Sequence, residues 1–216
     1  MTILALEFSS PQRSVAVARG REVLAEAVES GGGTPAFRLI EKVLTDAAVD
    51  RRQIEVVAVG LGPGSYTGIR AAIAIAQGWQ LARGVRLLGV SSADTLAAQA
   101  QAEQIFGRVN VIVDAQRGEV YRAAYDVCSD GWRLREPLSI VAPAATQPPG
   151  GAAERFVGPE VTKWFAGGKI LFPRASALVK LAACRSDFRP GETLEPIYLR
   201  ETNFVRSPPA ARPSRP

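Results

Sequence analysis

A group of three strand-like segments joined by short turns occurs twice in the chain, and this recurrence limits the possible folds. The segments are residues 2–8, 13–19 and 22–29 in the first half, and residues 109–115, 119–127 and 132–141 in the second. Each group is followed by helical segments and by strands without an exposed face. The sequence therefore predicts two related α/β lobes, each a mixed sheet with flanking helices.

The remaining segments predict the helices and strands that complete each lobe. We expect helices at 35–48, 68–83, 92–102, 159–166 and 174–186, and strands at 54–62, 86–90 and 154–158. Thr34 can cap the first helix, and Ser91 or Ser92 the third. A duplicated lobe of this kind is the plan of the actin-like (ASKHA, RNase H-like) fold, which usually holds a nucleotide between its lobes. The expected lobes are residues 1–103 and 104–200, followed by a disordered, basic, proline-rich tail at 201–216.

The absence of histidine from the 216 residues excludes several classes of site. Ser-His and Cys-His nucleophilic relays are impossible, and Cys128 and Cys184 cannot form a tetrahedral zinc site alone. A magnesium ion held by carboxylates remains open. Two unpaired cysteines, no signal peptide and no membrane-spanning segment predict a cytoplasmic protein. The net charge of +5 fits work near RNA, although arginines scattered along the chain, partly in the tail, are the stronger explanation.

Glycines are densest in residues 60–70, GLGPGSYTGIR, between a buried strand and a helix. Backbone amides at such a helix start can bind phosphate, which makes Gly62, Gly64 and Ser65 candidates for a nucleotide site. The alternative is that these glycines permit tight strand–helix packing and that Ser65 or Thr67 caps the helix. No lysine follows as in a P-loop.

Three polar residues at strand ends extend this candidate site. Glu7 and Ser9 end the first strand, and Asp114 occupies the equivalent position in the second lobe. They could hold a magnesium–phosphate group between the lobes. The alternatives are an ordinary turn at residues 7–10 and, at residues 114–119, a tight turn closed by an ion pair between Arg117 and a carboxylate.

The helix expected at 68–83 is apolar on nearly all sides. Only a narrow stripe around Arg70 and Gln77 is polar, so the helix needs a second cover besides its own sheet. Ala71, Ala74 and Gly78 are small enough for another helix to approach closely. The second cover is either a partner protein or another part of the same chain.

Five sequence blocks stand out along the chain: ILALEFSS, AVGLGPGSYTGIRAAIAIAQG, GVSS, DAQRGEVYRAAY and EPIYLR. In their residues and their order they resemble the TsaB (YeaZ) family. The resemblance implies an actin-like fold and a role in making N6-threonylcarbamoyladenosine in tRNAs that read codons starting with A. It implies a non-catalytic subunit that acts as the platform for a catalytic paralogue, TsaD, and works with an ATPase, TsaE.

The resemblance also implies where the partner binds. The family's contact with TsaD is a helical bundle formed by the helices at 35–48 and 68–83. The expected interface residues are Phe37, Ile40, Leu44, Ile69, Ala71, Ala74, Ile75 and Gly78. A homodimer of the isolated chain, indirect contact with tRNA, and ATP or ADP with Mg²⁺ in the complex are further expectations.

The chain departs from the family pattern at two places. Glu7 stands where an aspartate is usual, and Phe8 where a small hydroxyl residue is common. The start of the first helix often holds a His-Ser pair, whereas this chain has Ser30-Gly-Gly-Gly-Thr34. Both changes weigh against nucleotide binding by this chain. A metal- or nucleotide-dependent hydrolase and a free-standing RNA-binding module remain as alternative functions.

Overall fold

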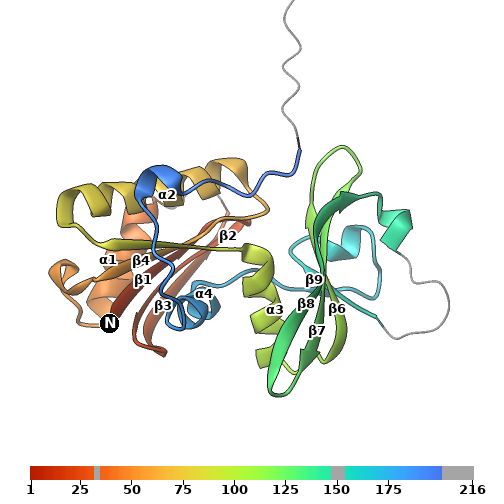
Figure 1. Ribbon diagram of the computed structural model, residues 1–216, viewed down its shortest axis with the longest axis horizontal. Coiled ribbons are helices and arrows are strands. Elements are labelled where there is room, and N and C mark those ends of the chain that lie inside the picture. Colours follow the sequence, from red (N-terminus) through yellow and green to blue (C-terminus); the bar gives the residue numbers. More distant parts are fainter. Residues whose placement is uncertain (32–34, 147–153, 201–216) are drawn as a thin grey trace, which may run out of the picture.

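Two five-stranded sheets form the framework of the protein, one in each lobe (Figure 1). The computed structural model describes residues 1–31, 35–146 and 154–200. The first sheet contains β1 (Thr2–Glu7), β2 (Gln12–Arg19), β3 (Glu22–Ser30), β4 (Val56–Gly60) and β5 (Arg86–Val90) in the order β3-β2-β1-β4-β5. Strand β2 is antiparallel to β1 and β3, whereas β1, β4 and β5 are parallel to one another.

The second sheet repeats this topology. Its strands are β6 (Gly107–Asp114), β7 (Val120–Cys128), β8 (Gly131–Val141), β9 (Arg155–Gly158) and β10 (Lys169–Ile170), in the order β8-β7-β6-β9-β10. Strands β6, β7 and β8 form an antiparallel meander, and β9 and β10 are parallel to β6. The same strand order in both lobes confirms the predicted actin-like fold class.

Helices cover both faces of the first sheet. Helices α1 (Ala36–Asp46) and α2 (Tyr66–Arg83) pack on the face that carries Leu4, Leu6 and Val15. Helix α4 (Ala175–Ala182) packs on the opposite face, against Ile3 and Ala5. Because the two faces are both buried, β1 and β4 have no exposed residue in their interiors.

Helix α3 (Ser92–Ala102) belongs to the other core. Leu96 and Ala100 pack against Val111 and Tyr125 of the second sheet. Helices α3 and α4 thus exchange lobes relative to the expected division at residues 103 and 104, and they contact each other where the lobes meet (Figure 1). The division into lobes remains a prediction, but each half of the chain contributes one helix to the other half's core.

Most predicted helices and strands are confirmed within one or two residues. The strand at 86–90 and the helix at 92–102 have the predicted limits, and Ser91 caps α3. The helix predicted at 159–166 is wrong, because this segment holds only a 3₁₀ turn at Val161–Lys163 between Pro159 and Gly167-Gly168. The cap at Thr34 and the tail at 201–216 lie outside the described residues.

Candidate functional site

The glycine-rich loop brings the end of β1 against the start of α2. The Ser65 amide donates a hydrogen bond of 2.6 Å to the Ser9 carbonyl, and the Ser65 hydroxyl accepts one of 3.3 Å from the Gly68 amide. Ser65 is therefore the cap of α2, as one alternative predicts. Gly64 has φ +145°, and a Cβ atom there would overlap the Ser9 carbonyl. Only glycine fits this close approach.

A cleft of about 1010 Å³ lies between the lobes. The first lobe contributes Ser9 and the loop residues Gly64, Ser65 and Tyr66 to its walls, and the second lobe contributes residues 113–117 and Glu160. Ser9, Gly64, Ser65 and Asp114, four of the residues predicted from the sequence to bind a nucleotide, therefore line one cavity. The volume is in the range that small-molecule ligands occupy.

Acidic groups line the second-lobe wall of this inter-lobe cleft. Asp114 accepts hydrogen bonds from the Gln116 amide at 2.7 Å and from Lys163 at 3.0 Å. Burial and the neighbouring Asp114 carboxylate raise the pKa of Glu160 above its usual range. Oε2 of Glu160 is buried without a hydrogen-bond partner among residues 1–31, 35–146 and 154–200. The wall can therefore accept hydrogen bonds from a ligand that carries hydroxyl or amino groups.

Tyr66, Tyr198 and Arg200 add aromatic and cationic side chains to the lining of the cleft. The rings of Tyr66 and Tyr198 stack with centroids 5.2 Å apart, and the guanidinium of Arg70 lies 4.3 Å from the Tyr66 ring centre. Arg200 bridges to the second lobe through Glu119 at 2.6 Å and the Ala115 carbonyl at 3.1 Å. Glu119 thus pairs with Arg200, which corrects the alternative that paired a carboxylate of this turn with Arg117. The sequence analysis missed Tyr198 and Arg200.

Glu7 and Gly62 do not line the cleft. Glu7 is fully buried, where its carboxylate accepts hydrogen bonds from the Ser9 amide at 3.0 Å and from the Ser92 hydroxyl at 3.0 and 3.2 Å. Burial raises the pKa of Glu7, while the hydrogen bonds from Ser9 and Ser92 oppose that rise. The amide of Gly62 donates to the Ser92 hydroxyl at 3.2 Å. Both residues instead tie β1 and the glycine-rich loop to the start of α3.

The outer face of α2 has no cover from the described parts of the chain. Ala74 and Gly78 are exposed on it, and Leu81 is 91% exposed. Phe37, on the neighbouring helix α1, is 62% exposed. Ala71 and Ile75 are half-buried at the edge of this surface.

Three of the residues expected at the partner interface belong to the core. Ile40, Leu44 and Ile69 are at most 5% exposed and pack in the first lobe. Ile69 is fully buried beneath the surface, whereas Ile40 and Leu44 each line a cavity between α1 and α2. Phe37, Ala71, Ala74, Ile75 and Gly78 are the expected interface residues that reach the surface.

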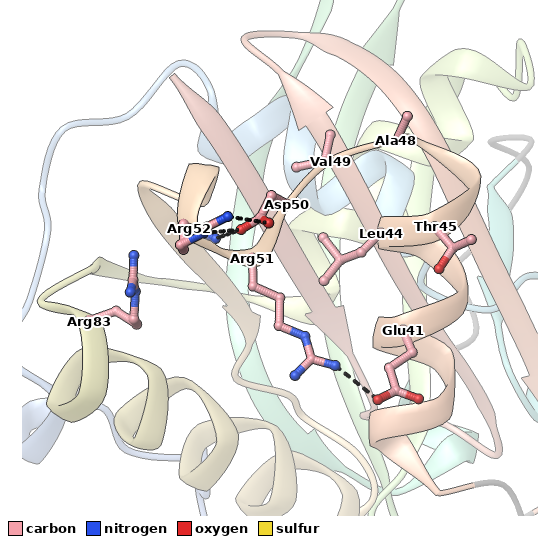
Figure 2. A pocket seen from close by; sticks show the side chains of 9 residues that line it. All are labelled: Glu41, Leu44, Thr45, Ala48, Val49, Asp50, Arg51, Arg52 and Arg83. Atoms are coloured by element: carbon pink, nitrogen blue, oxygen red, sulfur yellow. Dashed lines mark hydrogen bonds and ion pairs between the residues drawn. The ribbon is translucent and has the colours of Figure 1, made fainter.

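Two adjoining cavities run along the line between α1 and α2. The smaller one, of about 180 Å³, lies between Phe37 and Trp79. The larger one, of about 890 Å³, lies at the ends of both helices, beside the 3₁₀ turn Arg51–Gln53 (Figure 2). Glu41, Arg51 and Arg83 line both cavities, so the two form one feature, which we call the α1–α2 groove.

Two features are absent from the described residues. Within them, no three acidic or cysteine side chains converge as metal ligands would. No helix in the described parts of the chain is both long and apolar enough to cross a membrane.

Comparison with known proteins gives consistent matches. The family model of TsaD, tRNA N6-adenosine threonylcarbamoyltransferase, matches residues 36–181. TsaB of Escherichia coli, a tRNA threonylcarbamoyladenosine biosynthesis protein, is 32% identical over 75% of this chain and 78% of its own. An uncharacterized protein of Mycobacterium tuberculosis is 34% identical over 92% of both chains. The crystal structure of YeaZ from Pseudomonas aeruginosa superposes with a TM-score of 0.80 at 27% identity, covering 92% of this chain and 99% of YeaZ.

Proposed function

The chain belongs to the TsaB (YeaZ) family of tRNA threonylcarbamoyladenosine biosynthesis proteins, and from this premise we propose that it is a non-catalytic accessory subunit. In this proposal a TsaD-like paralogue transfers the threonylcarbamoyl group to N6 of the adenosine next to the anticodon. The present chain is the platform on which that paralogue is active. A TsaE-like ATPase joins the complex, and this chain meets tRNA only indirectly, through the complex. We expect the complex to act in the cytoplasm.

The observation that carries this proposal is the uncovered outer face of α2. A helix of 18 residues exposes Ala74 and Gly78 in a row, with Leu81 at its far end and Phe37 beside it. Small side chains allow a second helix to approach to roughly 8–10 Å. An exposed apolar face of this kind is typical of a protein–protein interface.

The division of labour follows from side-chain chemistry. The sequence contains no histidine, so a partner must supply any histidine-based metal site that the transfer requires. The same face of α2 would be available for a homodimer when the paralogue is absent. Assembly with the paralogue and self-association would then compete.

The inter-lobe cleft supports a second candidate, a nucleotide- or metal-dependent hydrolase. Its walls offer the start of α2 at Ser65 and the carboxylates Asp114 and Glu160, groups that can contact phosphate, Mg²⁺ or ribose hydroxyls. ATP or ADP with Mg²⁺ could occupy the cleft within the complex. Purified chain that hydrolyses neither ATP nor peptides above a buffer control would exclude this candidate. Turnover abolished by Asp114→Asn would favour it.

The accessory role is tested with the purified TsaD-like and TsaE-like proteins of the same organism. We expect that tRNA modification in the reconstituted mixture requires this chain. Ala74→Arg should abolish both binding to the TsaD-like protein and stimulation, because a long cation would be buried unpaired between two helices, at a cost of several kcal/mol. The variant should keep its fold by circular dichroism, since Ala74 is exposed in the isolated chain.

The matched control is Ala102→Arg, at the last residue of α3, where the side chain is also exposed. This control should bind and stimulate as the wild type does. Full modification without the chain would refute the accessory role. Normal binding by Ala74→Arg would refute the assignment of the surface while leaving the role intact.

A further inference from the structure

The inter-lobe cleft has an aromatic lining. Tyr66, Tyr121 and Tyr198, three of the four tyrosines of the chain, line it together with Pro11 and Pro159. Tyr66 is 55% exposed and Tyr198 is 36% exposed, so both rings keep surface that another molecule can cover. Proline-rich segments dock in grooves that aromatic side chains line, because their preformed polyproline II helix loses little entropy on binding.

Two carboxylates in the same cleft share one cationic partner. Lys163 forms an ion pair of 3.0 Å with Asp114, whereas Glu160 forms no ion pair within the described parts of the chain. Burial and the Asp114 charge hold the pKa of Glu160 above its usual range, as expected for a carboxyl pair without full charge compensation. Arg117 also lines the cleft, but it is exposed, so solvent and salt screen its repulsion of another cation. The carboxyl pair therefore favours a second cation, and a guanidinium can bond both carboxylates at once.

The described part of the chain ends at this cleft. Tyr198 and Arg200 belong to the lining, and Arg200 is tied to the second lobe by its ion pair of 2.6 Å with Glu119. Residue 201 therefore starts at the wall of the cleft. The sequence from 201 to 216, which we call the tail, is ETNFVRSPPAARPSRP. Its three arginines against one glutamate, and its four prolines, match the charge and the aromatic lining of the cleft.

From this match we propose that the tail docks in the inter-lobe cleft of its own chain. Arg206 pairs with Asp114 and Glu160, and Pro208 and Pro209 pack on the tyrosines. The tail is then an internal occupant that any other ligand of the cleft must displace. This docking goes beyond the accessory function and does not depend on it.

Reach and effective concentration both favour docking within one chain. Arg206 is six residues beyond Arg200, and six extended residues span up to about 20 Å. That length is enough to cross a cavity of about 1010 Å³. A segment tethered by a short linker acts at an effective concentration in the millimolar range, so even a weak contact keeps the cleft occupied.

The test uses trypsin, which cleaves after arginine unless a proline follows. Arg212 and Arg215 both precede a proline, so Arg206–Ser207 is the one bond that trypsin can cut within the tail. Mass spectrometry compares the rate of this cut in the full chain with the rate in a synthetic peptide of residues 201–216. We expect the bond to be cut at least about tenfold more slowly in the chain, because a docked Arg206 cannot enter the specificity pocket of the protease. The protection should not change with the concentration of the chain.

Variants of the cleft identify where the tail is held. Asp114→Asn combined with Glu160→Gln should remove most of the protection. Glu22→Gln combined with Glu29→Gln makes the same change of charge at two exposed glutamates of β3, and this control should keep the protection. Circular dichroism checks that both double variants are folded.

A variant of the tail gives the same test without a change in either lobe. Pro208→Gly combined with Pro209→Gly should also lose most of the protection, measured against a peptide that carries the same two changes. Glycine removes both the packing on the tyrosines and the preformed extended conformation.

Each other outcome would overturn the proposed docking. Equal rates in the chain and the peptide would show that the tail is not docked. Protection that survives the change of Asp114 and Glu160 would place the tail elsewhere on the molecule. Protection that rises with the concentration of the chain would mean that the tail of a second copy fills the cleft. None of these measurements uses the TsaD-like protein, so a failure of the accessory function would leave them unaffected.

Discussion

Gly64 and Glu7 fix the junction between the end of β1 and the start of α2, by different physical means. Gly64 lets two backbone segments touch, because no side chain fits beside the Ser9 carbonyl. Glu7 is a fully buried carboxyl group whose partners are the Ser9 amide and the Ser92 hydroxyl. Gly64 acts because it has no side chain. Glu7 acts through a carboxyl group that is hydrogen-bonded but removed from solvent.

Gly64→Ala should destabilise the chain by about 2–4 kcal/mol. The new methyl group would overlap the Ser9 carbonyl, and alanine would also be strained at a positive φ. Gly20→Ala is the matched control: φ there is +59°, but a Cβ would meet nothing within 4 Å. That control should lose only about 1–2 kcal/mol. Urea unfolding measures both, and equal losses would contradict the close approach at Gly64.

Glu7→Gln should change the pH dependence of stability. Because burial raises the pKa of Glu7 in the folded chain, the folded state holds this proton more tightly than the unfolded state does. The wild type therefore loses stability as pH rises from the unfolded-state pKa through the folded-state pKa. Glutamine cannot ionise, so the variant should gain stability relative to the wild type as the pH rises from the ordinary glutamate pKa, about 4.3, toward neutral.

The measurement is urea unfolding across that pH range. Glu29→Gln, at an exposed glutamate near the end of β3, is the control and should follow the wild-type curve. Parallel curves for Glu7→Gln and the wild type would contradict the raised pKa.

At the scale of single helices, α2 has two apolar sides with different uses. Its inner side, with Ile69, Ala72 and Ala76, is part of the core, whereas Ala74 and Gly78 face outward. Because the sequence of α2 is apolar on nearly all sides, it predicted that two faces of the helix must be covered. It did not show which residues lie on the core face and which on the outer face. Ile69 was therefore expected at the interface although it is fully buried.

Gly78 gives a prediction in which stability and binding change in opposite directions. Glycine inside a helix costs about 0.5–1 kcal/mol relative to alanine, and a Cβ at Gly78 meets nothing. Gly78→Ala should raise the free energy of unfolding by that amount, and Gly78→Leu should also keep the chain stable. Binding of Gly78→Leu to the TsaD-like protein should weaken by about tenfold or more, because the leucine blocks the approach of a second helix. Binding at wild-type affinity would place Gly78 outside the interface.

The sequence predicted elements well where the local signal was complete. Helix α3 has its predicted limits because Ser91 caps it and its apolar residues follow a helical period. Strand β10 was missed because two residues carry no pattern. Only some of the residues that line the cleft were predicted. Ser65 follows β4 in a recognisable loop and Asp114 ends β6. Tyr198 instead reaches the cleft through contacts between distant parts of the chain that no local pattern encodes.

Across the whole molecule, the C-terminal segment 188–200 holds the two lobes together. Leu194 is buried in the first core, and the Ile197 amide donates to the Leu61 carbonyl at 2.8 Å. Tyr198 then stacks on Tyr66, and Arg200 reaches the second lobe through Glu119. The segment thus connects α2, the cleft and the second lobe.

Truncation after Asp187 should therefore destabilise the chain by more than about 3 kcal/mol, whereas truncation after Arg200 keeps every contact described here. Leu194→Ala isolates the core contribution and should cost about 2–5 kcal/mol. Thermal unfolding measures all three variants. A melting temperature unchanged by truncation after Asp187 would show that the segment adds nothing to stability.

The exchange of helices between the lobes also determines when each face of the first sheet can be covered during synthesis. The first sheet is complete once Val90 has been made, yet one of its faces stays uncovered until Ala175–Ala182 has also been made. A nascent chain therefore carries an uncovered apolar sheet face while residues 91–174 are being made. Chaperone dependence should be greatest for ribosome-bound chains that end between Val90 and Ala175, and it should fall sharply once α4 is free to dock.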